Sequence, residues 1–108
     1  DIICLNYKIK RSNQKVKHYI IVKFNENVEK EKLINPIKKL FQKAMYIKEV
    51  MNVDIYESNM DLPNRYDLMI KMDLSKKALE EFDNGEIHKE WKEEFGKYIM
   101  NKTIFDCE

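Results

Sequence analysis

The stretch VKHYIIVKF, from Val16 to Phe24, decides the fold. Its residues alternate between two faces of an extended chain, with Val16, His18, Ile20, Val22 and Phe24 on one and Lys17, Tyr19, Ile21 and Lys23 on the other. Both faces are largely apolar and only the ends carry charge, which is typical of a central strand covered on both sides. His18 is the one polar residue in the middle of its apolar face. A buried imidazole usually has either a hydrogen-bond partner or a functional role. His18 is therefore the first candidate functional residue.

The composition predicts one globular domain, residues 1–108. The chain is 44% hydrophobic and 36% charged, which excludes a disordered tail. Its 20 basic and 19 acidic residues leave a net charge of +1, so a nucleic-acid partner is not expected. A basic run near the start and an acidic run between Glu80 and Glu94 are interpreted as solvated surface. Contact between these two regions is the alternative.

The two cysteines, Cys4 and Cys107, lie near opposite ends of the chain without CxxC or Cys/His spacing. This usage indicates a reducing compartment, and a single bond joining the termini is the alternative. No apolar run is long enough to span a membrane, and no signal peptide is recognised. The expected location is therefore cytoplasmic, with no membrane partner. A targeting sequence ahead of Asp1 remains the alternative, since the chain does not begin with Met.

One strand precedes the central stretch, and a helix and a hairpin follow it. Residues 1–10 alternate from Leu5 onward as a half-buried edge strand, and the polar residues 11–14 fit a hairpin loop. Apolar residues at helical spacing then predict one helix from about Val28 to Met45, disturbed near Asn35 by Pro36. Alternation predicts strands at 51–56 and 66–73, which the turn at 58–64 joins into an antiparallel hairpin.

Two helices and a strand complete the chain. Ser75 is a good N-cap for a short helix, and Gly85 is expected to end that helix in a left-handed conformation. A second amphipathic helix places five side chains on one side: Ile87, His88, Trp91, Phe95 and Tyr98. Residues 99–107 favour a last strand. This order predicts an α+β, ferredoxin-like βαββααβ sandwich with a four-stranded antiparallel sheet, plus the extra N-terminal strand.

The face of such a sheet that turns away from its helices is uncovered. Tyr19 and Ile21 lie on that face of the central strand, together with other apolar groups. An exposed apolar sheet face predicts a partner, most simply a second copy of the chain. Tyr19 and Ile21 are therefore candidate residues of a homodimer interface.

Four short segments together resemble the stress-responsive A/B barrel family, also called Dabb. They are residues 17–24 (KHYIIVKF), 65–70 (RYDLMI), 87–91 (IHKEW) and 104–106 (IFD). The resemblance implies a family core at 16–107, with residues 1–15 as an N-terminal extension. It also implies that the sheets of a homodimer close into a dimeric α+β barrel, with the helices outside.

The same resemblance implies a pair of candidate catalytic residues. The best understood member of the family, a plant cyclase, closes a linear polyketide with one histidine from the first strand and another from the last helix. His18 and His88 stand at these positions. Leu40 and Phe82 stand where that enzyme has tyrosines, and residues 85–88 read GEIH in place of His-Pro-Ala-His.

Two functions follow as hypotheses. In the first, the protein is a small homodimeric module without catalysis that acts through its surface or binds an apolar small molecule. Its ligand pocket would be lined by Leu40, Phe41, Phe82, Trp91 and Phe95, for which packing in the core is the alternative.

In the second hypothesis, the protein is an acid–base enzyme, polyketide-cyclase-like or lyase-like. One of His18 and His88 would remove a proton next to a carbonyl while the other held the oxyanion. A structural histidine pair is the alternative. No metal and no cofactor are expected, because the residues around His88 lack HExxH spacing and the chain has no glycine-rich phosphate loop.

Overall fold

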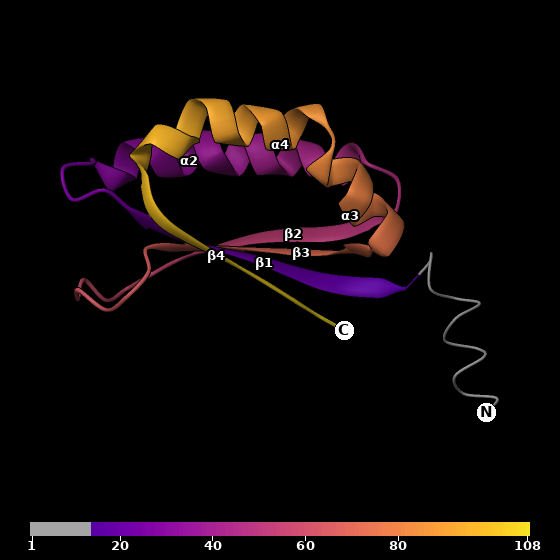
Figure 1. The fold of residues 1–108 in the computed structure, drawn as a ribbon, viewed down its shortest axis with the longest axis horizontal. Coiled ribbons are helices and arrows are strands. Elements are labelled where there is room, and N and C mark those ends of the chain that lie inside the picture. The colour runs from indigo at the N-terminus through magenta and orange to yellow at the C-terminus, as the bar shows by residue number, and fades with distance from the viewer. Residues whose placement is uncertain (1–13) are drawn as a thin grey trace.

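The computed structural model describes residues 14–108, and in them four strands form one antiparallel sheet. The strands are β1 (Lys15–Phe24), β2 (Val50–Glu57), β3 (Leu68–Ser75) and β4 (Ile99–Cys107), and the helices are α2 (Lys30–Gln42), α3 (Lys76–Asp83) and α4 (Glu86–Glu90). Their spatial order in the sheet is β2-β3-β1-β4. Figure 1 shows the helices gathered on one face of this sheet. The predicted ferredoxin-like α+β fold is confirmed.

β1 is a central strand, as its alternation predicts. It pairs with β3 through residues 15–22 and with β4 through residues 17–24. Its inner face, toward the helices, is buried from His18 onward, whereas Tyr19 and Ile21 on the outer face are only half-buried. Both faces of β1 were expected to be covered. In the single chain only the inner face is.

The N-terminal strand expected at residues 1–10 lies outside the described residues. The expected hairpin loop at residues 11–14 falls largely outside them too; within residues 14–108, β3 and β4 pair with the two edges of β1.

α2 begins at Lys30, two residues later than the expected Val28, and runs without interruption through Pro36. The expected disturbance near Asn35 is not a break. Pro36 lies in the middle of the helix, so its missing N–H removes one interior hydrogen bond, to the carbonyl of Lys32, without ending the helix. The helix changes instead at its end, where residues Lys43–Tyr46 form a 3-10 turn.

The hairpin of β2 and β3 is confirmed, although the connection between the strands is longer than expected. β3 starts at Leu68, so Tyr66 and Asp67 belong to the connection. Ser75 ends β3 and caps α3, because its hydroxyl accepts a hydrogen bond of 3.0 Å from the backbone N–H of Ala78.

Gly85 differs from its predicted role. Its φ of −99° is not left-handed, so it is not a left-handed stop for α3. A Cβ at this position would lie 2.9 Å from the backbone carbonyl oxygen of Glu81. Glycine is therefore required because the backbone at residue 85 lies close to the last turn of α3, and not because of its conformational freedom.

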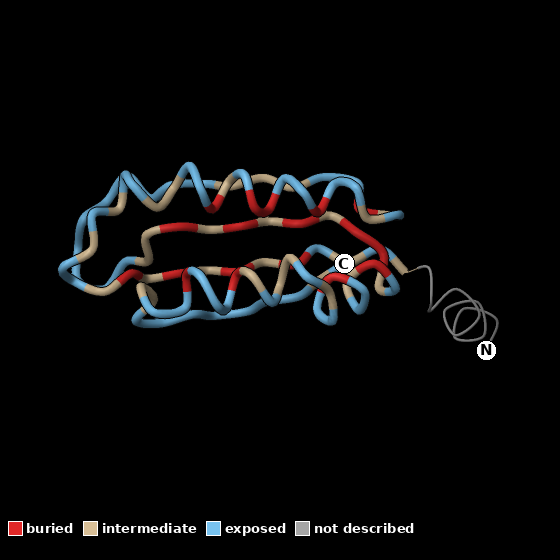
Figure 2. Tube along the Cα trace, turned by 90° about the horizontal axis from the view of Figure 1, so that it is seen from above, coloured by how far each residue is buried: buried red, intermediate tan, exposed pale blue. Residues whose placement is uncertain are grey.

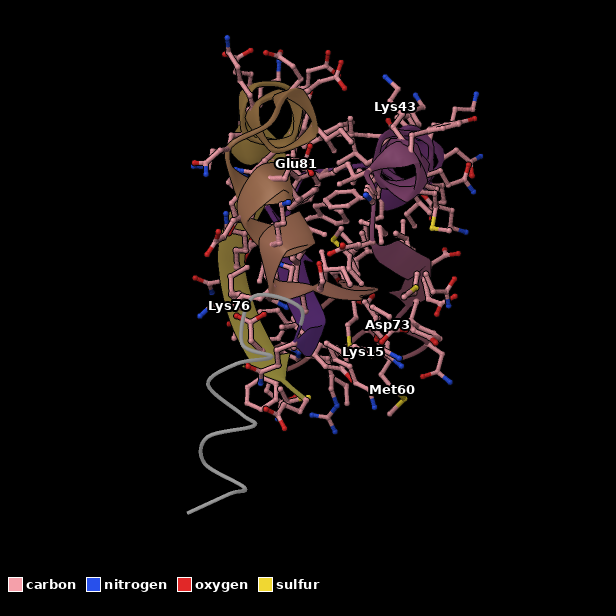
Figure 3. The ribbon with its side chains drawn as sticks, turned by 90° about the vertical axis from the view of Figure 1, so that its right-hand side faces the viewer. Lys15, Lys43, Met60, Asp73, Lys76 and Glu81 are labelled. Atoms are coloured by element: carbon pink, nitrogen blue, oxygen red, sulfur yellow. The ribbon has the colours of Figure 1, made fainter. Side chains whose placement is uncertain are left out.

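The last helix is short and changes its winding as it proceeds. After α4, residues Trp91–Phe95 form a π-helical turn and Gly96–Tyr98 a 3-10 turn, which leads directly into β4. Trp91 and Phe95 are both buried. Figure 2 shows buried positions recurring along the inner strands and on the facing turns of the helices, and Figure 3 shows from the end how side chains fill the space between the two layers.

Candidate functional site

His18 lies on the buried inner face of β1, directly opposite Asp106 of β4. Residues opposite each other on adjacent strands project to the same face, so the two side chains meet. The Nδ1 atom of His18 lies 2.5 Å from Oδ1 of Asp106. An ionised carboxylate only accepts hydrogen bonds, so Nδ1 carries the proton and donates it. In the neutral imidazole this leaves Nε2 as an acceptor.

Asp106 is the functional candidate that sequence reasoning missed. Its side chain is 47% exposed, in contrast to the buried imidazole that it holds. The alternation of β4 could have placed it on the inner face, but only the register of β1 against β4 joins it to His18. The hydrogen-bond partner that a buried histidine requires is therefore a carboxylate from 88 residues away.

His88 lies near His18, with Phe82 in contact with both. The Phe82 ring centroid lies 6.4 Å from that of His18 and 5.6 Å from that of His88, both in edge-to-face geometry. Within residues 14–108, no hydrogen bond joins the two imidazoles directly. The fold thus brings the two predicted histidines into one neighbourhood and makes Phe82 their shared neighbour.

The environment of His88 favours its neutral form. Burial lowers the pKa of His88 below its ordinary value, and the nearby charges of Lys92 and Lys102 lower it further, against an opposing effect of Asp83. Lys102 lies on β4 opposite Val22, so its side chain is on the same inner face as Asp106. At neutral pH His88 can accept or donate a hydrogen bond without carrying a charge.

The five side chains predicted to line a pocket are buried together: Leu40, Phe41, Phe82, Trp91 and Phe95. Their rings are in contact, since the centroid of Phe41 lies 5.9 Å from that of Phe82 and 5.0 Å from that of Trp91. Trp91 in turn lies 5.7 Å from Phe95. A ligand that entered here would have to displace closely packed rings, which is costly.

Tyr19 and Ile21, the predicted interface residues, lie on the outer face of the sheet. Tyr19 is opposite Phe105 of β4, at 6.2 Å between ring centroids, and Ile21 is opposite Met69 of β3. Tyr56 of β2 pairs with Met69 and extends the apolar area to the next strand. We call these five residues the outer patch. Phe105 is 58% exposed in the single chain, so this patch is open.

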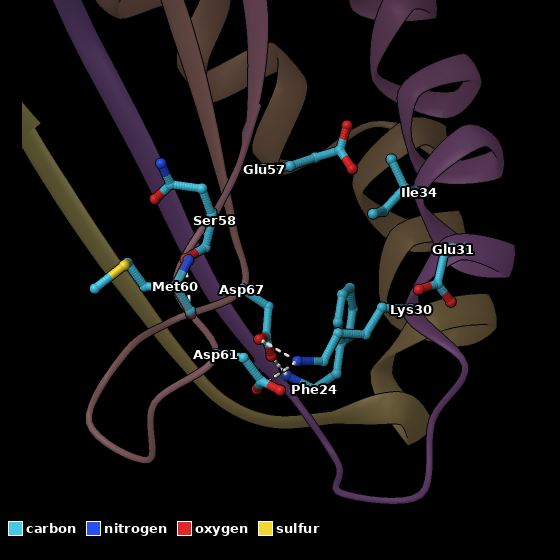
Figure 4. Close-up of a pocket in the computed structure, with 10 residues that line it drawn as sticks. Phe24, Lys30, Glu31, Ile34, Glu57, Ser58, Met60, Asp61 and Asp67 are labelled. Atoms are coloured by element: carbon cyan, nitrogen blue, oxygen red, sulfur yellow. Dashed lines mark hydrogen bonds and ion pairs between the residues drawn. The ribbon is translucent and has the colours of Figure 1, made fainter.

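Neither histidine lines either of two cavities in the described part of the chain. One, of about 320 Å³, lies between the start of α2 and the connection from β2 to β3, and Figure 4 shows Lys30 and Asp67 joined at its wall. The second, of about 340 Å³, lies where β1 begins and β4 ends, and Asp106, Val16 and Leu79 are among its lining residues. The second cavity therefore reaches the exposed side of the carboxylate that holds His18.

Residues 14–108 contain no group of three or more His, Cys, Asp or Glu side chains placed to hold a metal ion. The same residues contain no helix that is both long and apolar enough to cross a membrane.

Comparison with known proteins gives similarity at the level of the fold. No protein-family model and no curated protein matches the chain. Among solved structures, a dimeric ferredoxin-like protein of unknown function from Thermobifida fusca is 12% identical with a TM-score of 0.75, covering 88% of this chain and 91% of that one. A Dabb family protein with a ferredoxin-like fold from Mesorhizobium loti is 11% identical with a TM-score of 0.67, covering 87% and 95%.

A third similar structure is the hydroxynitrile lyase from Passiflora edulis, 13% identical with a TM-score of 0.70, covering 88% of this chain and 93% of that one. The class that these structures define is the ferredoxin-like α+β fold, seen in proteins described as dimeric and in a Dabb family member. The predicted resemblance to Dabb proteins is therefore confirmed for the fold.

Proposed function

We propose that this protein is a homodimeric module whose two copies meet through the outer patch. The observation that carries the proposal is the half-buried or exposed state of Tyr19, Ile21, Phe105 and Tyr56 on one continuous sheet face. Apolar side chains gathered on one face lose contact with water when a second copy covers them. Two solved structures with the same fold are described as dimeric, which supports a homodimer.

Sedimentation velocity at micromolar concentration tests this proposal. The unmodified chain should sediment as a dimer, and Phe105→Glu should sediment as a folded monomer because it introduces a charge into the interface. Phe105 is already exposed in the single chain, so the substitution leaves the core intact. Tyr46→Glu is the matched control, because Tyr46 is 92% exposed and lies in the 3-10 turn after α2, outside the outer patch. A monomeric unmodified chain would defeat the proposal.

We propose acid–base catalysis by His18 and His88 as the second candidate function. The carboxylate of Asp106 on Nδ1 of His18 favours it, since this contact fixes the tautomer that leaves Nε2 free to accept a proton. His88, kept neutral by its surroundings, can hydrogen-bond the oxygen on which charge develops. The ring of Phe82 would have to turn away for a substrate to reach both imidazoles.

A lyase assay tests the second candidate, because one protein of this fold is a hydroxynitrile lyase. With mandelonitrile as probe, Nε2 of His18 would take the hydroxyl proton, the carbon–carbon bond would break, and benzaldehyde and cyanide would leave. Turnover above the uncatalysed rate should fall at least about a hundredfold in His18→Gln, and also in Asp106→Asn, which loses the charge that stabilises the imidazolium. Turnover that His18→Gln leaves unchanged would rule out His18 as the base.

A further inference from the structure

The inner face of β4 is exposed to solvent, although the matching face of β1 is buried. Three residues of β4 lie directly opposite buried residues of β1 and project to the same side of the sheet: Lys102 opposite Val22, Ile104 opposite Ile20 and Asp106 opposite His18. None of the three β1 residues is more than 5% exposed, whereas Ile104 is 46% exposed and Lys102 is exposed as well. The helices therefore cover β1 and leave Lys102, Ile104 and Asp106 open, and we call these three residues the β4 strip.

The β4 strip is a face of the strand and not its edge. Backbone pairing along that edge with a second copy would use N–H and C=O groups and would not by itself cover side chains that project toward the helices. The outer patch lies on the opposite face, so the dimer contact proposed above does not use the strip. Figure 1 shows β4 running away from the helices toward its C-terminal end, in agreement with the exposure of these side chains.

Two lysine ammonium groups lie close to His88. Lys92 follows His88 by four residues, about one helical turn, and Lys102 projects from the β4 strip. Burial lowers the pKa of His88 most, and the charges of Lys92, Lys102 and His18 lower it further, against the opposing effect of Asp83. Within residues 14–108 neither lysine forms a salt bridge. The side of His88 that faces the strip therefore carries positive charge that no adjacent carboxylate neutralises.

We propose that the substrate of the site formed by His18 and His88 is an apolar carbonyl compound with a carboxylate group, and that Lys102, together with Lys92, binds this carboxylate. The inference rests on the acid–base function proposed for the two histidines and names the substrate class of that site. Ammonium groups form charge-assisted hydrogen bonds with carboxylates, which are stronger than hydrogen bonds to a neutral amide. Lys102 is then a specificity-determining residue, because it distinguishes an anionic substrate from a neutral one of the same shape.

The spacing along β4 sets where the two ends of such a substrate would lie. Residues 102 and 106 are four positions apart on a strand, which is about 13 Å. The reacting carbonyl would lie near His18, at the level of Asp106, and the carboxylate near Lys102, with the apolar side chain of Ile104 between them. This distance exceeds the Debye length of about 8 Å at physiological ionic strength, so the charge of Asp106 opposes carboxylate binding only weakly.

Titration with a charged and a neutral probe tests the carboxylate site without any turnover. The probes are 4-phenylbutyrate and its amide, which have nearly the same shape and differ in charge. In NMR titrations of the full-length chain, 4-phenylbutyrate should shift the imidazole signals of His88 and bind at least about tenfold more tightly than the amide. Lys102→Met should remove most of this difference, and Lys102→Arg, which keeps the charge, should retain it. Lys89→Met is the matched control, because Lys89 is exposed and its position next to His88 points to another side of the helix.

Equal affinity for the two probes, or a difference that Lys102→Met leaves unchanged, would overturn the proposal. It would also be overturned if Lys102→Met converted a dimer into a monomer in sedimentation, because Lys102 would then serve the contact between copies. Mandelonitrile turnover separates this inference from the function on which it rests. Turnover that His18→Gln abolishes, together with equal probe binding, would reject the carboxylate site alone. Charge-dependent probe binding without any turnover would support the carboxylate site and count against the acid–base function.

Discussion

Replacing Asp67 should destabilise the fold more than replacing any carboxylate residue near it. Asp67 lies in the connection before β3, and its side chain is only 11% exposed. One carboxylate oxygen accepts a hydrogen bond of 2.8 Å from the backbone N–H of Phe24, at the end of β1. The other accepts one of 2.7 Å from Nζ of Lys30, at the start of α2. One side chain therefore ties together three parts of the chain.

The magnitude follows from what Asp67→Ala leaves behind. The backbone N–H of Phe24 would lose its partner in a buried position, which costs about 1–3 kcal/mol. The ammonium of Lys30 is 39% exposed, so water can replace its lost contact and adds little to the cost. We expect a loss of about 2 kcal/mol in the free energy of unfolding. Asp67→Asn keeps an acceptor for Phe24 and should lose about 1 kcal/mol.

The pH dependence of this contribution has a definite sign. Burial by itself raises the pKa of Asp67, but the hydrogen bonds from Lys30 and Phe24 and the charges of Lys30 and Lys23 together hold the pKa below its usual value. A carboxyl group whose pKa is lowered by folding stabilises the native state above its unfolded pKa, about 3.9, and loses this contribution as the pH falls through the folded value. The difference between the unmodified chain and Asp67→Asn should therefore shrink below about pH 4.

Urea unfolding followed by circular dichroism measures these differences. Asp61→Ala is the control, because Asp61 is fully exposed and lies 3.7 Å from the same Lys30 ammonium. Its loss should change the free energy of unfolding by less than about 0.5 kcal/mol. If Asp67→Ala were as stable as Asp61→Ala, or if its effect grew as the pH fell below about 4, the account of this contact would be wrong.

Three further outcomes are expected. Ser75→Ala should lower the free energy of unfolding in urea by about 1 kcal/mol, because the N-cap hydrogen bond of α3 is removed. An unchanged free energy would show that this cap does not stabilise the helix. Gly85→Ala should lower the melting temperature because its Cβ would meet a backbone carbonyl at 2.9 Å, whereas Gly96→Ala, with nothing within 4 Å, should leave it unchanged or raise it. NMR titration should find a pKa for His88 below the usual 6.5, and Lys92→Met should raise that pKa; a shift in the opposite direction would contradict the electrostatic explanation.

The sequence predicts on which face of its element each histidine lies, but it does not predict how the two histidines are placed relative to each other. Alternation in β1 was sufficient to put His18 on the inner face, and helical spacing was sufficient to put His88 on the side of Trp91. Neither pattern predicts the distance between β1 and the last helix. The insertion of Phe82 as the neighbour of both imidazoles follows from the packing of α3 onto the sheet.

Local patterns by themselves determined the order of strands and helices, the central place of β1, the outward position of Tyr19 and Ile21, and the cap at Ser75. Each depends on the period of side chains along one element or on a hydrogen bond within a few residues. The tertiary structure alone decided that Asp106 hydrogen-bonds His18, that Asp67 joins three segments, and that β2 and β4 are the edge strands of the sheet. These contacts depend on the register and order of strands far apart in sequence, which are set by the packing of the whole core and leave no mark in a local pattern.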